Sequence, residues 1–186
     1  MLFKAIISAT IAASSAFAAP IETRSTTSIA PSAMWTYQVD SGAILSSTLG
    51  DVCKGTGNGG KDTTTLLTFT YPEDVLGKQC QFEFSLDATS GLAGSKKLDV
   101  YSSSNPAPGP TTGWGPGNQR NRHLGRLSVE LSAVATWDAT YDTYLTTKTP
   151  CKAGGTTEGF ELVGVYDNDS IGWSSSTGAG LRIIVS

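Results

Sequence analysis

Residues 79–87 constrain the fold more than any other part of the chain. Their apolar side chains alternate strictly with polar ones, and the apolar set is Cys80, Phe82, Phe84 and Leu86. Because successive side chains of a strand point to opposite faces, this pattern predicts a strand with one face in a core and the other in water. A strand of this kind has to pair with neighbours, so the segment predicts a sheet.

Other segments along the chain also have the composition of strands. They are residues 34–39, 63–71, 97–102, 127–132, 140–147, 160–162 and 181–185. Gly and Pro separate them, and no window shows convincing helical spacing. We therefore predict an all-β fold, a two-sheet antiparallel sandwich of about eight strands. The expected central residues are Trp35, Phe82, Phe84, Phe160 and Leu162.

The first residues have the pattern of a secretion signal. Lys4 supplies the positive charge, residues 5–13 are mostly apolar, and residues 16–18 (AFA) have the small-x-small form that signal peptidase accepts. No other stretch is apolar over the roughly 18 residues that a membrane helix requires, so we expect no membrane insertion. The predicted organisation is a signal peptide over 1–18, a short pro-segment or flexible N-terminus over 19–32, and a single β-sandwich domain over 33–186.

The charge of the chain excludes one class of partner. The formal net charge is −3, and removal of Lys4 with the signal makes it −4. An acidic balance gives no electrostatic basis for binding nucleic acid. Together with the signal, it predicts a protein that is secreted, extracellular or in the cell wall.

Three cysteines enter an oxidising compartment if the signal acts, so one disulfide and one remaining thiol are expected. Three pairings are possible. We favour Cys80–Cys151, because each borders a predicted strand, whereas Cys53 lies beside the glycine-rich residues 55–60.

Three segments together resemble a known family. They are residues 77–84 (GKQCQFEF), 150–155 (PCKAGG) and 178–183 (GAGLRI). Their order and spacing resemble the secreted fungal family named after the C-terminal domain of the ubiquitin-3-binding protein But-two, over residues 63–186. The resemblance implies a fungal source, a β-sandwich, and correspondence of Cys80 and Cys151 with the family's two cysteines. It brings no catalytic residues with it.

Residues 102–122 interrupt the strand pattern. They contain four prolines and four glycines around Trp114, with Arg120 and Arg122 close behind. Ordered loops of this length are often functional. A loop tryptophan stacks on sugar rings, and arginines bond to sugar hydroxyls, so we predict ligand binding by Trp114, Arg120 and Arg122. The alternative is that Trp114 folds back and pins the loop to the sandwich.

The residues that could support catalysis are sparse. His123 is the single histidine, no G-x-S-x-G motif is present, and a zinc site takes three or more protein ligands. Asp138 and Asp142 are close enough in sequence to suggest the paired carboxylates of a glycosidase, although such acids more often flank a turn. We predict no enzymatic activity, no metal and no cofactor.

Residues 167–170 (DNDS) are rich in oxygen ligands. They suit either calcium or a turn in which Asp and Asn bond to their own backbone. The same residues form the sequon Asn168-Asp169-Ser170, which predicts N-glycosylation of an exposed Asn168.

Together these features predict a secreted, non-enzymatic β-sandwich protein at the fungal cell surface or cell wall, or facing a host. Its expected partner is a cell-wall polysaccharide or an extracellular protein. The alternative is a glycan-binding module or a carbohydrate-active enzyme. A contiguous exposed aromatic strip would favour binding, and a cleft with converging carboxylates would favour catalysis.

Overall fold

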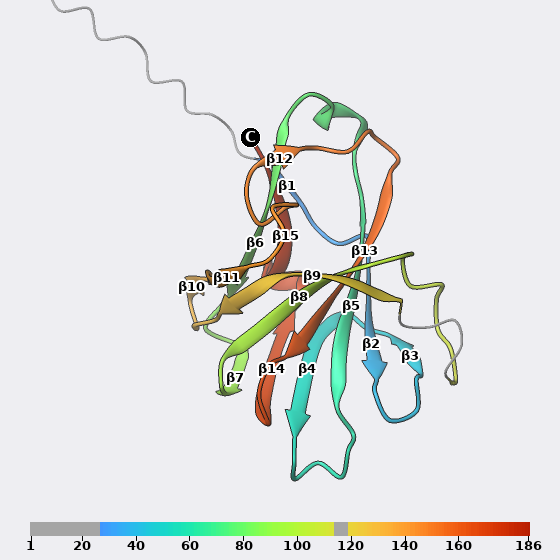
Figure 1. The fold of residues 1–186 in the computed structure, drawn as a ribbon, viewed down its shortest axis with the longest axis vertical. Coiled ribbons are helices and arrows are strands. Elements are labelled where there is room, and N and C mark those ends of the chain that lie inside the picture. Colours follow the sequence, from blue (N-terminus) through green and yellow to red (C-terminus); the bar gives the residue numbers. More distant parts are fainter. Residues whose placement is uncertain (1–26, 114–118) are drawn as a thin grey trace, which may run out of the picture.

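The computed structural model of the chain describes residues 27–113 and 119–186 (Figure 1). Trp114 and the predicted signal peptide lie outside the described residues. The described chain is built of strands, with two short 3₁₀ turns, η1 (Glu73–Val75) and η2 (Ser175–Thr177). None of its helical segments has the length and apolar character required to span a membrane. The prediction of an all-β, two-sheet sandwich is confirmed.

The smaller sheet, sheet A, is antiparallel and contains the segment that the sequence defines best. Its order is β1 (Thr27–Ile29), β15 (Gly180–Val185), β6 (Gln79–Leu86) and β10 (Ala133–Val134), and β12 (Thr149–Pro150) also pairs with β6. In β6 the predicted alternation is confirmed, because Cys80, Phe82, Phe84 and Leu86 are all buried.

The larger sheet, sheet B, curls around the other side of the core. Its order is β11 (Thr136–Thr140), β9 (Arg120–Ser128), β8 (Lys97–Ser103), β13 (Thr157–Gly164), β5 (Thr63–Thr70), β4 (Leu49–Gly55), β14 (Asn168–Ser174) and β7 (Gly91–Gly94). The hairpin of β2 (Ala33–Gln38) and β3 (Ile44–Ser46) pairs with β5 through β2. The described residues thus form more strands than the eight expected, largely through additional strands of two to four residues.

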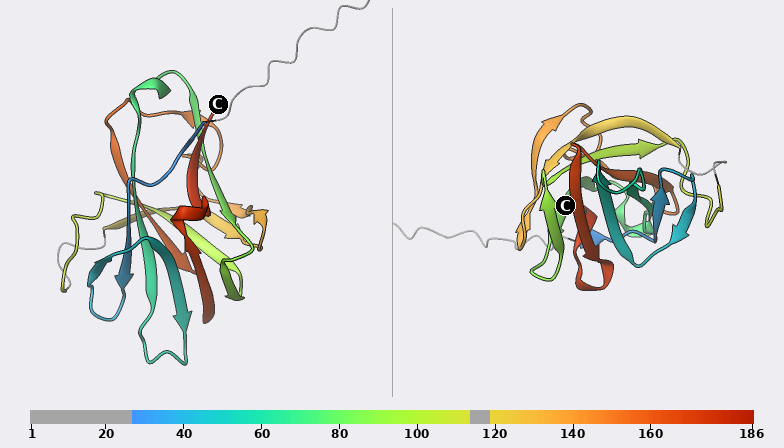
Figure 2. Two further views of the ribbon diagram at one scale, coloured as in Figure 1. Left: turned by 180° about the vertical axis from the view of Figure 1, so that it is seen from behind. Right: turned by 90° about the horizontal axis from the view of Figure 1, so that it is seen from below.

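The strands of the two sheets enclose the core (Figure 2). Aromatic side chains fill the space between the sheets. The rings of Phe82 in sheet A and Phe160 in sheet B meet edge to face, with centroids 4.8 Å apart. Phe84 meets Trp173 in the same way at 5.3 Å. Such contacts add to the free energy gained by burying the rings. Trp35, expected in this core, instead packs with Tyr37 on the opposite face of sheet B.

The predicted disulfide between Cys80 and Cys151 is confirmed. It joins β6 to the segment that follows β12, and the Cys151 amide also donates to the carbonyl of Lys78 at 2.9 Å. Cys53, in β4, is a free thiol.

Three expected segment boundaries are wrong. The flexible N-terminus expected to residue 32 contains β1, where the buried Ile29 pairs with Ile183. The loop expected over 102–122 is entered by β9, because Arg120 pairs with Ser103 at the end of β8. Residues 140–147, expected as a strand, turn after Thr140, because the Asp142 side chain accepts a hydrogen bond from the Tyr144 amide at 2.9 Å.

The described part of the long loop lies against sheet B. Thr111 exchanges two backbone hydrogen bonds with Ile44 of β3, at 3.0 and 3.1 Å. Pro106 passes so close to Gly159 that a Cβ on this glycine would lie 2.8 Å from the Pro106 Cα. A side chain at position 159 would therefore push the loop off the sheet.

Candidate binding site on the outer face of sheet B

The outer face of sheet B carries a row of aromatic and charged side chains. In β8, Leu98 and Val100 point into the core, so Asp99 and Tyr101 point outward. Across the ladder Asp99 pairs with Arg126, and Tyr101 pairs with His123. We call the whole set the aromatic strip, and its members are Asp99, Tyr101, Arg120, His123, Arg126, Tyr141 and Tyr166.

Three rings of the strip, those of Tyr101, His123 and Tyr141, are in contact in a row. Tyr101 and His123 stack with centroids 4.4 Å apart and planes 18° apart. Tyr141, just after β11, packs on the other side of this pair, 4.5 Å from His123. The Arg120 guanidinium lies 4.8 Å from the Tyr101 ring centre, a distance that permits cation–π attraction. The side chains therefore form one continuous surface.

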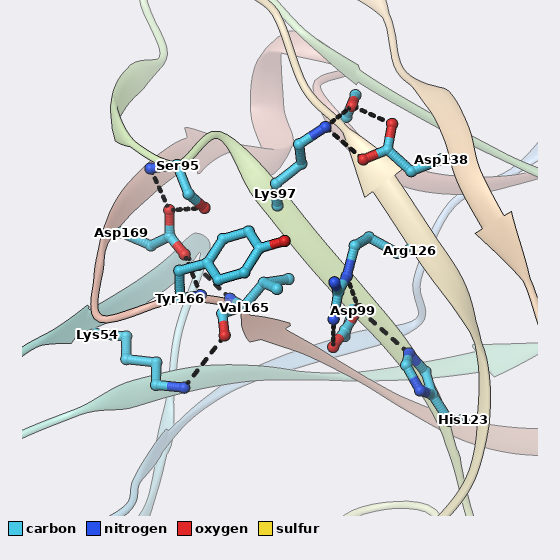
Figure 3. A network of polar contacts seen from close by, with 11 residues as sticks. Lys54, Ser95, Lys97, Asp99, His123, Arg126, Asp138, Val165, Tyr166 and Asp169 are labelled. Carbon is cyan, nitrogen blue, oxygen red and sulfur yellow. Dashed lines mark hydrogen bonds and ion pairs between the residues drawn. The ribbon is translucent and has the colours of Figure 1, made fainter.

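Asp99 organises the middle of the strip (Figure 3). Its Oδ1 accepts from Arg126 Nε at 2.8 Å, and its Oδ2 accepts from Arg126 Nη2 at 3.0 Å. These hydrogen bonds raise the pKa of Arg126, so its guanidinium stays charged. His123 Nε2 lies 3.2 Å from Asp99 Oδ1, but the contact is not aligned for a hydrogen bond. Two-point contact fixes the plane of the guanidinium.

A second arginine–carboxylate pair closes the strip at Arg120. Its Nε and Nη2 donate to the two oxygens of Glu161 at 2.8 and 2.7 Å. Thr64 donates to Glu161 Oε1 at 2.7 Å, and the carboxylate is fully buried. These hydrogen bonds raise the pKa of Arg120. The predicted ligand-binding role of Arg120 is thus combined with a structural one, because the residue spans β9 and β13.

Tyr166 owes its position to the turn between β13 and β14 (Figure 3). The buried Asp169 accepts from the amides of Val165 and Tyr166 through Oδ2, at 3.0 and 3.3 Å. Its Oδ1 accepts from the amide and hydroxyl of Ser95, at 2.8 and 2.6 Å. As the turn interpretation expects, Asp169 bonds to nearby backbone, in the turn before β14, and is occupied by this chain's own donors. Asn168, Asp169 and Ser170 themselves belong to β14 and not to the turn. The Arg126 guanidinium lies 5.5 Å from the Tyr166 ring centre.

The strand that leads to Tyr141 is held by another charged group. Lys97 of β8 donates to Asp138 of β11 and to Ser128 of β9, and Ser128 also donates to Asp138. These bonds, first that from Lys97, lower the pKa of Asp138. Asp142 pairs with a different cation, Arg122, at 2.5 Å. The two carboxylates considered as a possible glycosidase pair are thus each bound to their own basic residue.

Two tyrosines make the strip accessible. Tyr141 is 58% exposed and Tyr166 is 55% exposed, although both rings contact other members of the strip. Exposed aromatic faces flanked by fixed guanidinium groups can stack on the apolar face of a sugar ring and donate to its hydroxyls. The arrangement lies on a sheet face, and it suits an extended polar ligand.

The remaining predicted site residues lie elsewhere. Arg122 points toward the end of the sandwich, where it binds Asp142. Asn168 is exposed at the start of β14, as glycosylation would require. Sequence reasoning missed Tyr101, Tyr141 and Tyr166, because no local pattern joins them. The one available signal was the exposed-face position of Tyr101 in an alternating strand.

Among residues 27–113 and 119–186, no group of three or more His, Cys, Asp and Glu side chains is placed to hold a metal ion. No family model matches the chain. No curated protein is significantly similar to it.

Proposed function

We propose that this is a secreted, non-enzymatic β-sandwich protein of the fungal cell surface or cell wall, and that it binds a glycan on the aromatic strip. The observation that carries the proposal is the continuous contact of Tyr141, His123 and Tyr101 on an outward sheet face. A row of rings spanning several strands matches the length of an oligosaccharide better than that of a single small molecule. Stacking of this kind buries little area, so the expected dissociation constant lies in the range of about 1 mM to 1 μM.

The charges of the strip favour binding over catalysis. Hydrolysis of a glycosidic bond takes two carboxyl groups that face the substrate across a cleft. Here Asp99 and Glu161 are each bound at two points by an arginine, on neighbouring strands of one sheet. Their role in the proposal is to hold Arg120 and Arg126 as fixed donors.

The extracellular part of the proposal is supported by different features. The N-terminal pattern of Lys4, an apolar stretch and residues 16–18 is that of an exported protein. A disulfide between Cys80 and Cys151 is typical of oxidising compartments. The exposed Asn168 is suited to carry a glycan. The fungal source rests on the resemblance to the But-two family, and membership of that family is part of the proposal.

Retention on insoluble wall polymers tests the proposed function. The mature protein is incubated with chitin and with β-glucan, and the bound fraction is measured against polymer concentration. Tyr141→Ala and Tyr166→Ala should each weaken binding about tenfold, equivalent to roughly 1.4 kcal/mol. Leu76→Ala is the matched control, because Leu76 is an exposed apolar residue in a different part of the fold, after η1.

Two results would contradict the proposal. Retention that is unchanged in both tyrosine variants would move the glycan site away from the strip. If the wild-type protein is retained by neither polymer, an extracellular protein becomes the favoured partner.

A further inference from the structure

A second site lies at one end of the sandwich, separate from the aromatic strip. A cavity of about 310 Å³ opens there between β8, β9, β13 and the segment that contains Tyr144 and Lys152. Its lining includes Ser102 and Phe160, whereas the neighbouring Tyr101 and Glu161 point to the opposite face of sheet B. Gly159 and Pro106, which meet on the outer face, also line it, so the cavity lies at the ends of these strands. No member of the aromatic strip lines it.

The single carboxylate that lines the cavity is satisfied by neutral donors. Tyr71 donates to Glu158 Oε2 at 2.9 Å, and Tyr144 donates to the same oxygen. Burial, followed by the hydrogen bond to Glu158, raises the pKa of Tyr144, so its hydroxyl stays a donor through the neutral and mildly alkaline range. Both donors are neutral hydroxyl groups, so neither of them neutralises the charge of the Glu158 carboxylate.

Two basic residues line the same cavity. The Lys152 ammonium lies 5.2 Å from the centre of the Tyr144 ring. Arg122 contacts Asp142 through Nη1 alone, at 2.5 Å, and its side chain is 57% exposed. A guanidinium has five N–H donors, so most of the Arg122 donors remain for a ligand. Lys152 directly follows the disulfide-bonded Cys151, which fixes its backbone beside β6.

The rest of the lining matches a sugar ring more closely than a bare anion. Five residues of the lining are serine or threonine, and they are Ser102, Ser103, Ser104, Thr156 and Thr157. The apolar ring of Pro106, which is partly exposed, also belongs to the lining. Hydroxyl groups both donate and accept, so they can bond to sugar hydroxyls in both directions, whereas an anion without protons could only accept from them. A cavity of about 300 Å³ is at the small end of ligand pockets.

We propose that this cavity binds a uronic acid unit, an acidic monosaccharide free or at the end of a chain. Its carboxylate lies between Arg122 and Lys152, and its ring hydroxyls bond to Glu158 and to the serine and threonine side chains. The inference goes beyond the proposed function, because it concerns another site and another ligand charge. The tests of the cavity and of the aromatic strip change different residues, so one proposal can fail without the other.

Titration of the disulfide-bonded protein with methyl glycosides tests the proposal. The methyl glycosides of glucuronic and galacturonic acid are compared with methyl glucoside and with inorganic phosphate, by amide chemical shifts. Saturable shifts of residues around the cavity are expected with at least one uronate. Lys152→Gln and Arg122→Gln should each weaken uronate binding by about tenfold or more. Lys148→Gln is the control, because Lys148 is exposed four residues earlier and lines a different hollow.

The comparison ligands separate the competing explanations. Equal affinity for methyl glucoside would overturn the role of the two cations. Equal affinity for phosphate would reduce the cavity to an unspecific anion site and overturn recognition of the sugar. Uronate binding that is lost in Tyr141→Ala but kept in Lys152→Gln would place the ligand on the strip. Thermal melting of each variant shows whether a lost signal reflects unfolding, and the second cation variant then decides the outcome.

Discussion

Phe160 and Glu161 are neighbours in β13, and both are almost completely removed from solvent, at 1% and 0% exposure. Phe160 lies between the sheets, where Phe69 and Phe82 meet it edge to face. Glu161 lies on the opposite face under Arg120, where Thr64 also donates to its carboxylate. One strand thus excludes water on its two faces by different chemistry.

The two faces respond differently to change for this reason. Apolar packing is non-directional, so the inner face loses free energy in proportion to the area and volume removed. A buried ion pair depends on both partners, and removal of one leaves an uncompensated charge. The outer face can therefore orient ligand-binding groups, but its tolerance of substitution should be lower than its exposure suggests.

The largest loss is expected on the inner face. Phe160→Ala removes the ring that contacts Phe69 and Phe82, and it should lower the free energy of unfolding by about 3–5 kcal/mol. Urea denaturation followed by tryptophan fluorescence measures the change. A loss below about 1 kcal/mol would mean that the two sheets do not pack through this residue.

The second-largest loss in the free energy of unfolding is expected on the outer face of sheet B. Glu161→Gln keeps the shape of the side chain but removes the charge that faces Arg120, and the expected loss is about 3 kcal/mol. This value is at the low end for buried pairs, because the Arg120 side chain is 38% exposed. Glu130→Gln, an exposed position just after β9, is the control and should change stability little. If the two variants are equally stable, the pair contributes nothing to the fold.

At the end of the sandwich, the two buried tyrosines Tyr71 and Tyr144 should make the stability of the fold depend on alkaline pH. Burial raises the pKa of Tyr71 and of Tyr144 above 10.0, the ordinary value for tyrosine. The stability that these groups contribute is complete below pH 10, and it falls as the pH rises further, because the unfolded chain ionises first. Each group steepens the fall by at most about 1.4 kcal/mol per pH unit.

Tyr144→Phe should make this dependence shallower. Denaturation midpoints between pH 9 and about 11.5 measure it, and Tyr141→Phe, at an exposed ring, is the matched control. A wild-type stability that is flat over this range would show that neither hydroxyl is held in its neutral form.

The smallest effect is expected at the edge of sheet B. Asp138→Asn removes the ion pair with Lys97, whose two side chains are about one third exposed, and should cost less than about 1 kcal/mol. The loss should shrink in 1 M salt, where the charges are screened. A loss above about 2 kcal/mol would mean that Asp138 acts as part of a wider network with Ser128.

Local alternation was sufficient to predict part of the inner layer, whereas β14, which contributes the buried Trp173, was not predicted. The side chains of Phe82 and Phe84 follow a period of two, and this period alone assigns them to the core. The disulfide between Cys80 and Cys151 was also predictable, because both residues border strands that the pattern identifies. Trp35 was assigned to the wrong face, since its size favours burial without saying on which side of the sheet.

The aromatic strip could not be predicted in this way. Tyr101, His123 and Tyr141 come from three segments, and they meet only because β8 pairs with β9 and β9 pairs with β11. Register between strands depends on turns and bulges that the local pattern does not contain. The turn at Asp142 was missed because tyrosine and threonine favour strands. The Asp142 side chain instead accepts a hydrogen bond from the Tyr144 amide, which stabilises the turn.

The pairing of β1 with β15 also determines how the fold would yield under mechanical load. Thr27 pairs with Val185, and Ile29 pairs with Ile183, so both ends of the described chain leave sheet A at the same end (Figure 1). Tension applied through these ends would open the hydrogen bonds of this ladder one after another, as a zip, instead of loading them together in shear. Behind β15 lies β6, which the Cys80–Cys151 bond ties to the rest of the chain. A stretched molecule would therefore release its first and last strands at low force, and the residues between Cys80 and Cys151 could not be extended while the disulfide is intact.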